Sequence, residues 1–193
     1  MLGMTSTSEQ QLIRRAQRGD GEAVAALYRR HVDAIARYIA YRVPDDAIVE
    51  DLTAEVFLRM VEGLPTYRPT GAPFEAWLYR IAAARVADYY RRQARVAEDT
   101  LDESSVADVP ALEFDLSQQE EFDTLRAALQ QLSDEQQTIL LLRFVERKSH
   151  EEVARILDKS EQAVATAQHR ALKKLAELLG TDKRDRHYLR GRS

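Results

Sequence analysis

Hydrophobic residues recur every three or four positions along most of the chain, a spacing that predicts helices. In the N-terminal half this pattern predicts four helices, over residues 9–18, 22–42, 46–62 and 74–95. Ser8, with Gln11 three residues later, is expected to cap the first, and glycine- and proline-containing turns separate the others. No stretch has the period of two that marks a strand, so the predicted fold class is all-α.

The last third of the chain has the pattern of a helix-turn-helix. Ser133 with Gln136 and Ser149 with Glu152 are capping boxes that mark two helix starts, and Ser160 marks a third. Only three residues separate the last two predicted helices, so they must cross steeply, which presents the final helix outward. This geometry offers a helix to the major groove and indicates DNA binding.

Charge is distributed unevenly along the 193 residues, whose net charge is −4. Residues 96–124 carry ten acidic and no basic side chains, whereas residues 181–193 form a basic tail. The central segment also lacks helical periodicity, so we expect a flexible acidic linker between two helical domains. This linker is either a tether kept extended by its charge or a strip that covers a basic DNA-binding face.

Composition narrows the classes of function. The chain has no cysteine, which excludes disulfides and thiolate sites, and its four histidines lack metal-ligand spacing. No phosphate-binding or dinucleotide-binding glycine motif is present, so we expect neither an enzyme nor a cofactor. No apolar run is long enough to span a membrane, and the N-terminus lacks a signal pattern, so the expected location is the cytoplasm.

Two groups of residues in the N-terminal half are not needed for a core. Asp51 and Glu55 are one helical turn apart, with Leu58 beyond them, on a face away from the apolar stripe. They form either a docking face for a basic partner or an ordinary solvated acidic face. The second group mixes aromatic and arginine residues around a proline-rich loop, a combination suited to unpaired bases or simply to solubility: Tyr67, Arg68, Tyr79, Arg80, Arg85, Tyr89, Tyr90, Arg91, Arg92 and Arg95.

The last predicted helix divides into a buried and an outward face. Periodicity is expected to bury four apolar residues: Val164, Ala171, Leu172 and Leu175. It leaves six residues available to DNA: Gln162, Ala165, Thr166, His169, Arg170 and Lys173. Gln162 and Thr166 have the chemistry to contact base edges, while Arg170 and Lys173 suit phosphates.

Several motifs in order resemble the sigma-70 family of bacterial RNA polymerase sigma factors. Residues 51–58 and 74–82, DLTAEVFL and FEAWLYRIA, are similar to region 2 of that family. Residues 140–144, 149–156 and 169–175 are similar to region 4. Two domains joined by a short linker resemble the extracytoplasmic-function (ECF) group. The predicted domains are residues 9–95 (region 2), 96–121 (linker), 122–180 (region 4) and 181–193 (tail).

The resemblance implies partners for each surface. In the family, region 2 docks on the clamp coiled coil of the largest polymerase subunit, which assigns polymerase binding to Asp51, Leu52, Glu55, Val56, Phe57 and Leu58. It recognises and melts the minus-ten promoter element, which assigns DNA contacts to Tyr67, Arg68, Arg80, Arg85, Tyr89, Arg91 and Arg92. Region 4 contacts the polymerase flap and the minus-thirty-five element, which assigns DNA contacts to Gln162, Thr166, His169, Arg170 and Lys173.

The resemblance has departures, and it leaves alternatives to be tested. The last helix has Ala165 and Ala167 where the family usually carries cations, and Gln168 where it often has leucine. Family members are often regulated by an anti-sigma factor, which makes one a candidate partner. The alternatives are a stand-alone transcriptional regulator and a module that only sequesters an anti-sigma factor.

Overall fold

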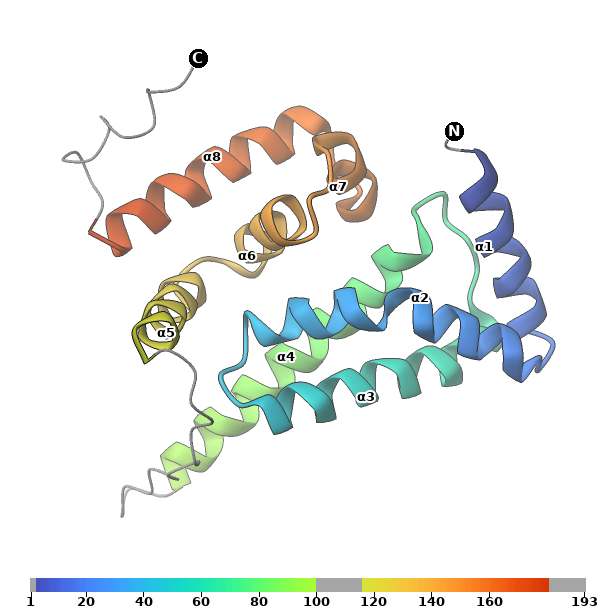
Figure 1. Cartoon of the computed structure of the whole chain (residues 1–193), viewed down its shortest axis with the longest axis horizontal. Coiled ribbons are helices and arrows are strands. Elements are labelled where there is room, and N and C mark those ends of the chain that lie inside the picture. Colours follow the sequence, from blue (N-terminus) through green and yellow to red (C-terminus); the bar gives the residue numbers. More distant parts are fainter. Residues whose placement is uncertain (1–2, 100–115, 181–193) are drawn as a thin grey trace. The chain divides into compact units, whose positions relative to one another are not determined.

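The computed structural model describes residues 3–99 and 116–180, all of which are helical or in the turns between helices. Residues 100–115, in the expected linker, and the basic tail at 181–193 lie outside the described residues. The chain divides into two compact units, of which the first holds α1, α2, α3 and α4 up to Arg92. The second is built on α5, α6 and α8 (Figure 1). The all-α prediction is confirmed for the described residues.

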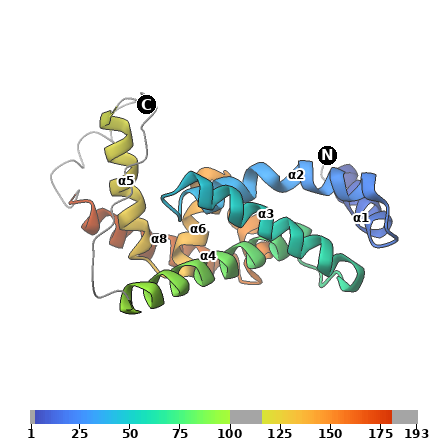
Figure 2. The same cartoon turned by 90° about the horizontal axis from the view of Figure 1, so that it is seen from below.

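The first unit begins with α1 (Gly3–Ala16), α2 (Gly21–Ala40) and α3 (Asp46–Gly63). The predicted start of α1 at Ser8 is wrong, because no helix breaker separates residues 4–8 from the rest of the helix. The carboxylates of Asp20 and Asp45 accept backbone N–H groups at the starts of α2 and α3. The α2 helix packs against both α1 and α3 (Figures 1 and 2).

A 3₁₀ turn, η1 (Leu64–Thr66), and an exposed loop connect α3 to α4 (Phe74–Asp99). The α4 helix packs on the bundle through aromatic contacts, including Tyr79 edge-on to Tyr38 of α2 at 5.3 Å between ring centroids. The α4 helix continues four residues past its predicted end. The core of this unit holds large side chains from α2, α3, η1 and α4: Leu27, Ile35, Tyr38, Ile39, Leu52, Met60, Leu64 and Leu78.

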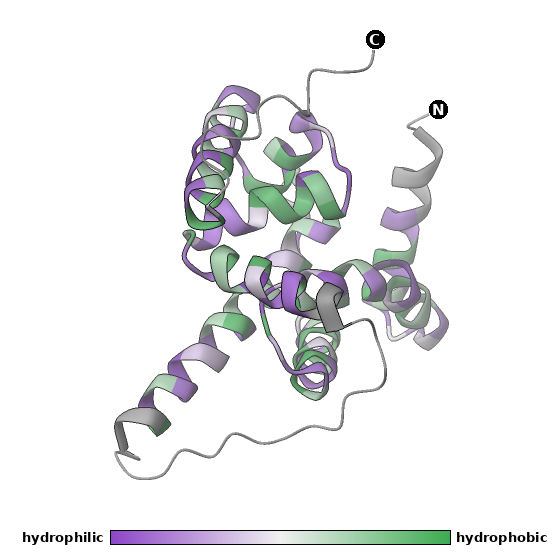
Figure 3. Ribbon diagram, turned by 60° about the vertical axis from the view of Figure 1, so that its left-hand side comes forward, coloured by the Kyte–Doolittle hydropathy of each residue, from purple (hydrophilic) through white to green (hydrophobic). Residues whose placement is uncertain are grey.

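The C-terminal part of the chain contains α5 (Leu116–Gln130), α6 (Asp134–Leu140), α7 (His150–Leu157) and α8 (Glu161–Leu178). Both predicted capping boxes are present; in the second, Ser149 N–H donates to Glu152 at 2.7 Å and Glu152 N–H donates to Ser149 at 3.1 Å. Ser160 caps α8 as predicted. Colouring by hydropathy shows hydrophobic and hydrophilic residues mixed along the helices (Figure 3). Among the described residues, no helix is long and apolar enough to cross a membrane.

A π-helical turn, η2 (Leu141–Val145), follows α6 directly and was not predicted. Glu146 N–H donates to Leu141 O at 3.0 Å, the wider spacing of a π turn. Arg147 and Asp158 then adopt left-handed φ values of 53° and 54°, which reverse the chain before α7 and before α8. Lys159 N–H closes the second reversal on Ala154 O at 2.9 Å.

Candidate polymerase and nucleic-acid interfaces

The outer face of α3 combines exposed apolar and acidic side chains. Leu58 is 58% exposed and Val61 is 46% exposed, and Asp51 lies exposed on the same helix. Glu55 lies between them in the sequence and is partly exposed. We call Asp51, Glu55, Leu58 and Val61 the α3 docking face. The sequence analysis did not identify Val61 as a surface residue, because the nearby apolar residues Phe57 and Met60 belong to the core. Its exposure is seen only once the helices are packed.

Three of the residues expected to bind polymerase lie in the core. Leu52, Val56 and Phe57 are all buried among the helices of the first unit. Phe57 packs edge-on against Tyr28 of α2, with ring centroids 4.8 Å apart. Tyr28 itself is partly exposed. Because it belongs to α2, the pattern of residues along α3 could not identify it. These three residues therefore support the docking face from beneath it and do not lie on its surface.

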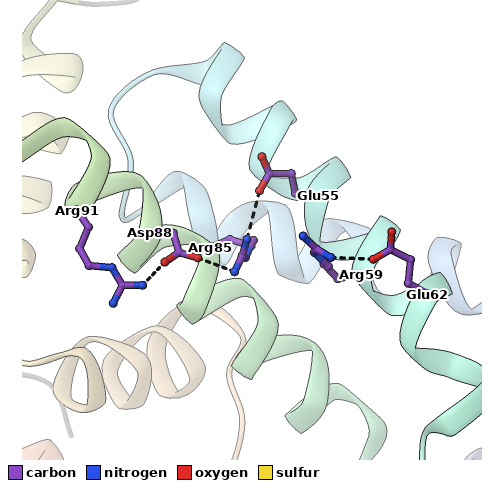
Figure 4. Close-up of polar contacts among 6 residues, drawn as sticks. All are labelled: Glu55, Arg59, Glu62, Arg85, Asp88 and Arg91. Carbon is purple, nitrogen blue, oxygen red and sulfur yellow. Dashed lines mark hydrogen bonds and ion pairs between the residues drawn. The ribbon is translucent and has the colours of Figure 1, made fainter. Parts of the chain in front are cut away.

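An ion-pair chain joins α3 to α4 beside the docking face. Figure 4 shows Arg85 between Glu55, at 4.0 Å, and Asp88, at 2.5 Å. Arg91 also binds Asp88, and its hydrogen bond, with the charge of Arg85, lowers the pKa of the Asp88 carboxyl. Arg85, an expected DNA contact, is thus committed to two carboxylates of its own domain, as Arg91 is to one.

The loop expected to meet DNA starts from an aromatic cluster. The Tyr67 ring lies 4.7 Å from that of Trp77 and 5.2 Å from that of Phe74. Burial raises the pKa of the Tyr67 hydroxyl, and the charge of Glu9 acts in the same direction. Gly63 allows the cluster to form, because a Cβ there would come within 2.8 Å of Trp77. Tyr67 therefore has a structural role at the base of the loop.

Exposed arginines surround this loop and continue along α4. Arg68 lies in the loop, and Arg80 and Arg92 lie on α4, all exposed. Tyr89 is half-buried and stacks edge-on with Tyr90 at 5.0 Å, while the Tyr90 hydroxyl donates to Arg42 O. The loop and α4 thus present cations beside aromatic rings, the combination that binds single-stranded nucleic acid.

The α8 helix presents the residues expected to read DNA. All five are exposed, and the Thr166 hydroxyl donates to Gln162 O at 2.8 Å. Val164 and Ala171 are buried as predicted, but Leu172 is 38% exposed and Leu175 only partly buried. The predicted burial of Leu172 is wrong because no described element covers that side of α8 fully.

A polar cluster behind α8 was also missed. The Gln168 carbonyl oxygen accepts from Arg143 Nε at 3.0 Å and lies 3.1 Å from His150 Nε2. Arg143 also donates to Lys148 O, so one guanidinium connects η2, the turn after it and α8. Sequence distance hides this cluster, since Arg143 and Gln168 are 25 positions apart.

Comparison with known proteins matches two segments of the chain to one family. Residues 27–96 match the sequence model of Sigma-70 region 2, and residues 122–175 match that of Sigma-70, region 4. The ECF RNA polymerase sigma factor BldN of Streptomyces coelicolor is 38% identical over 178 residues, covering 90% of this chain and 67% of BldN. ShbA of Streptomyces griseus, also an ECF sigma factor, is 36% identical and covers 86% of this chain and 93% of its own.

Solved structures agree with this assignment. The structure of CnrH in complex with the cytosolic domain of CnrY has a TM-score of 0.63 and 26% identity, covering 90% of this chain and 98% of CnrH. Sigma factors bind core RNA polymerase and DNA, and they are not enzymes. The chain therefore belongs to the sigma-70 family, in its extracytoplasmic-function group, and is a sigma factor for transcription initiation by RNA polymerase.

Proposed function

We propose that the α3 docking face binds the clamp coiled coil of the largest polymerase subunit. The observation that carries this proposal is the exposure of Leu58 and Val61 on a helix whose other large apolar residues are mostly buried, namely Val49, Leu52, Val56, Phe57 and Met60. Exposed apolar side chains beside carboxylates suit an interface with an apolar centre and a charged rim. Asp51 and Glu55 would meet basic side chains of the partner, which offsets the repulsion between like charges one turn apart.

The promoter contacts divide between the two domains in this proposal. The loop after Tyr67, with Arg68, Arg80 and Arg92, binds the melted minus-ten element, where aromatic rings and cations suit unpaired bases. The exposed face of α8 reads the minus-thirty-five element as duplex, with Gln162 and Thr166 at base edges. Region 4 also contacts the polymerase flap, and the protein acts in the cytoplasm, where it meets core polymerase and promoters.

Run-off transcription tests the whole proposal. Core polymerase is supplied with this protein and a pool of promoter fragments from its own source. We expect transcripts from discrete start sites only when the protein is present. A variant carrying Leu58→Asp and Val61→Asp should lose polymerase binding and transcripts together, while Val96→Asp, which alters a valine of α4 that is 60% exposed, should retain polymerase binding. Transcription by the double variant at the wild-type level would exclude the α3 docking face.

An anti-sigma factor is a further proposed partner. The sigma factor RpoE of Bartonella quintana, whose structure was solved in complex with the anti-sigma factor NepR, resembles this chain in fold, with a TM-score of 0.57 and 22% identity. We expect such a partner to cover the α3 docking face and so to exclude core polymerase, because two partners cannot occupy the same apolar patch at once. Competition between that partner and core polymerase for this chain would test the assignment.

A further inference from the structure

Gln17 makes a long-range contact with the backbone that leads into the loop between η1 and α4, residues 68–73, which we call the minus-ten loop. It directly follows α1, and its side-chain amide donates to Leu64 O at 3.1 Å and to Tyr67 O at 2.8 Å. The two acceptors are 47 and 50 positions away in the sequence. Both N–H groups of one amide are therefore used to hold the backbone of η1 and the residue that follows it.

Tyr67 is the last residue fixed before the chain enters the exposed loop. Its N–H closes the 3₁₀ turn on Leu64 O at 3.1 Å, and its ring packs on Trp77. The carbonyl of Tyr67 precedes Arg68, so its orientation sets the direction in which the loop leaves the bundle. Gln17 fixes that carbonyl from outside the turn.

The other end of the loop is braced by the same helix. Glu9 of α1 lies 3.0 Å from His31 Nε2 on α2, and Arg30 adds a weaker contact at 3.6 Å. The His31 ring in turn lies 5.7 Å from that of Phe74, the first residue of α4. The α1 helix therefore reaches the start of the loop directly and its end through His31.

We infer that Gln17 is a positioning residue for the minus-ten loop, and that α1 is a working part of promoter recognition. Gln17 does not touch DNA in this role; it acts by holding Tyr67 O. The α1 helix lies before residue 27, outside the segment matched by the region 2 model. The inference rests on the proposed function of the loop, so its test needs one readout that requires no DNA.

Five substitutions separate the amide hydrogen bonds from shape and charge. Gln17→Met keeps the length of the side chain and removes both donors, while Gln17→Glu replaces the amide by a group that only accepts. Gln17→Lys restores donors at the end of a helix, where a cation is favoured. Gln11→Met and Gln11→Lys are the matched controls, because Gln11 is an exposed glutamine on α1, the helix that Gln17 follows.

The first readout is hydrogen exchange, in the full chain, of the amides of Leu64 and Tyr67, which are the hydrogen-bonded amides at the start of the loop. We expect faster exchange at these amides in Gln17→Met and Gln17→Glu, with core amides of α2 and α3 unchanged. Gln17→Lys should exchange like the wild type. Unchanged exchange at these amides in Gln17→Met would overturn the inference, and so would a failure of Gln17→Lys to restore it.

The second readout is binding of a single-stranded minus-ten oligonucleotide to the holoenzyme. A loop in its competent conformation for only a tenth of the time weakens apparent affinity tenfold, so we expect about tenfold weaker binding for Gln17→Met. The affinity of Gln17→Met for core polymerase should not change. A general loss of folding would lower that affinity, so this measurement separates the two causes. If the wild-type holoenzyme fails to bind the oligonucleotide, the proposed function of the loop fails, while hydrogen exchange still decides whether Gln17 orders it.

Discussion

Removing the two apolar side chains of the α3 docking face should weaken polymerase binding without unfolding the protein. Burying a whole leucine or valine side chain is worth about 1.5–3 kcal/mol. Leu58 is 58% exposed and Val61 is 46% exposed, so these two side chains can bury about half of that amount each in an interface. The variant Leu58→Ala with Val61→Ala is therefore expected to lose about 2 kcal/mol of binding free energy, or about thirtyfold in Kd.

The assay is a fluorescence titration of labelled protein with core polymerase, with thermal melting of the free protein as a control. Exposed truncations change folding stability by only about 0.5 kcal/mol, so the melting temperature should stay close to that of the wild type. Val96→Ala is the matched control, because Val96 is 60% exposed on α4. The reasoning would be refuted if the double variant and Val96→Ala both had Kd values within threefold of the wild-type value.

Three further predictions concern the scaffold. Gly63→Ala should cost about 1–3 kcal/mol of stability in thermal melts, because the new Cβ meets Trp77 at 2.8 Å, and full retention of stability would show that the indole moves cheaply. Burial acts to raise the pKa of the Glu9 carboxyl, but hydrogen bonds and charges from His31 and Arg30 lower it by more, so the net pKa is lowered. The ionised carboxylate therefore stabilises the fold at pH values above the ordinary pKa of a glutamate. That stabilisation is lost in acid as the pH falls through the lowered pKa. Glu9→Gln should thus flatten the acid limb of stability, and an unchanged limb would contradict this. Gln168→Leu should weaken binding to minus-thirty-five duplex about tenfold, since Arg143 loses its partner on α8 and keeps only Lys148 O, whereas Gln168→Glu should retain binding. Equal affinities of the two variants would show that the cluster is a passive contact.

Sequence reasoning located most helices because the signals that begin and end them are local. Ser133 and Ser160 cap helices where their spacing predicted, and α3 ends within one residue of its predicted end. The start of α1 was misplaced because a serine with the right spacing can also lie inside a helix. The π turn at Leu141–Val145 left no signal, since an inserted residue does not disturb a run of apolar side chains.

The candidate site was predicted less completely than the fold because its residues are placed by contacts between helices. Phe57 has the spacing of an outward residue beside Leu58, yet it is buried against Tyr28, a partner on another helix. Arg85 has the charge expected of a DNA contact, yet Asp88 and Glu55 hold it. Periodicity assigns a residue to a face of its own helix, but it does not say which other helix covers that face.

The surfaces of a sigma factor must stay exposed to be used, and this limits how they can be held in place. Apolar packing fixes an element by burying it, which would remove the loop and α8 from their DNA partners. Gln17 and Gln168 avoid this conflict, because one amide group can bind two partners and fix direction without burying the surface. In this proposal, half-buried glutamines behind exposed reading surfaces set orientation, while the exposed side chains are left to set specificity.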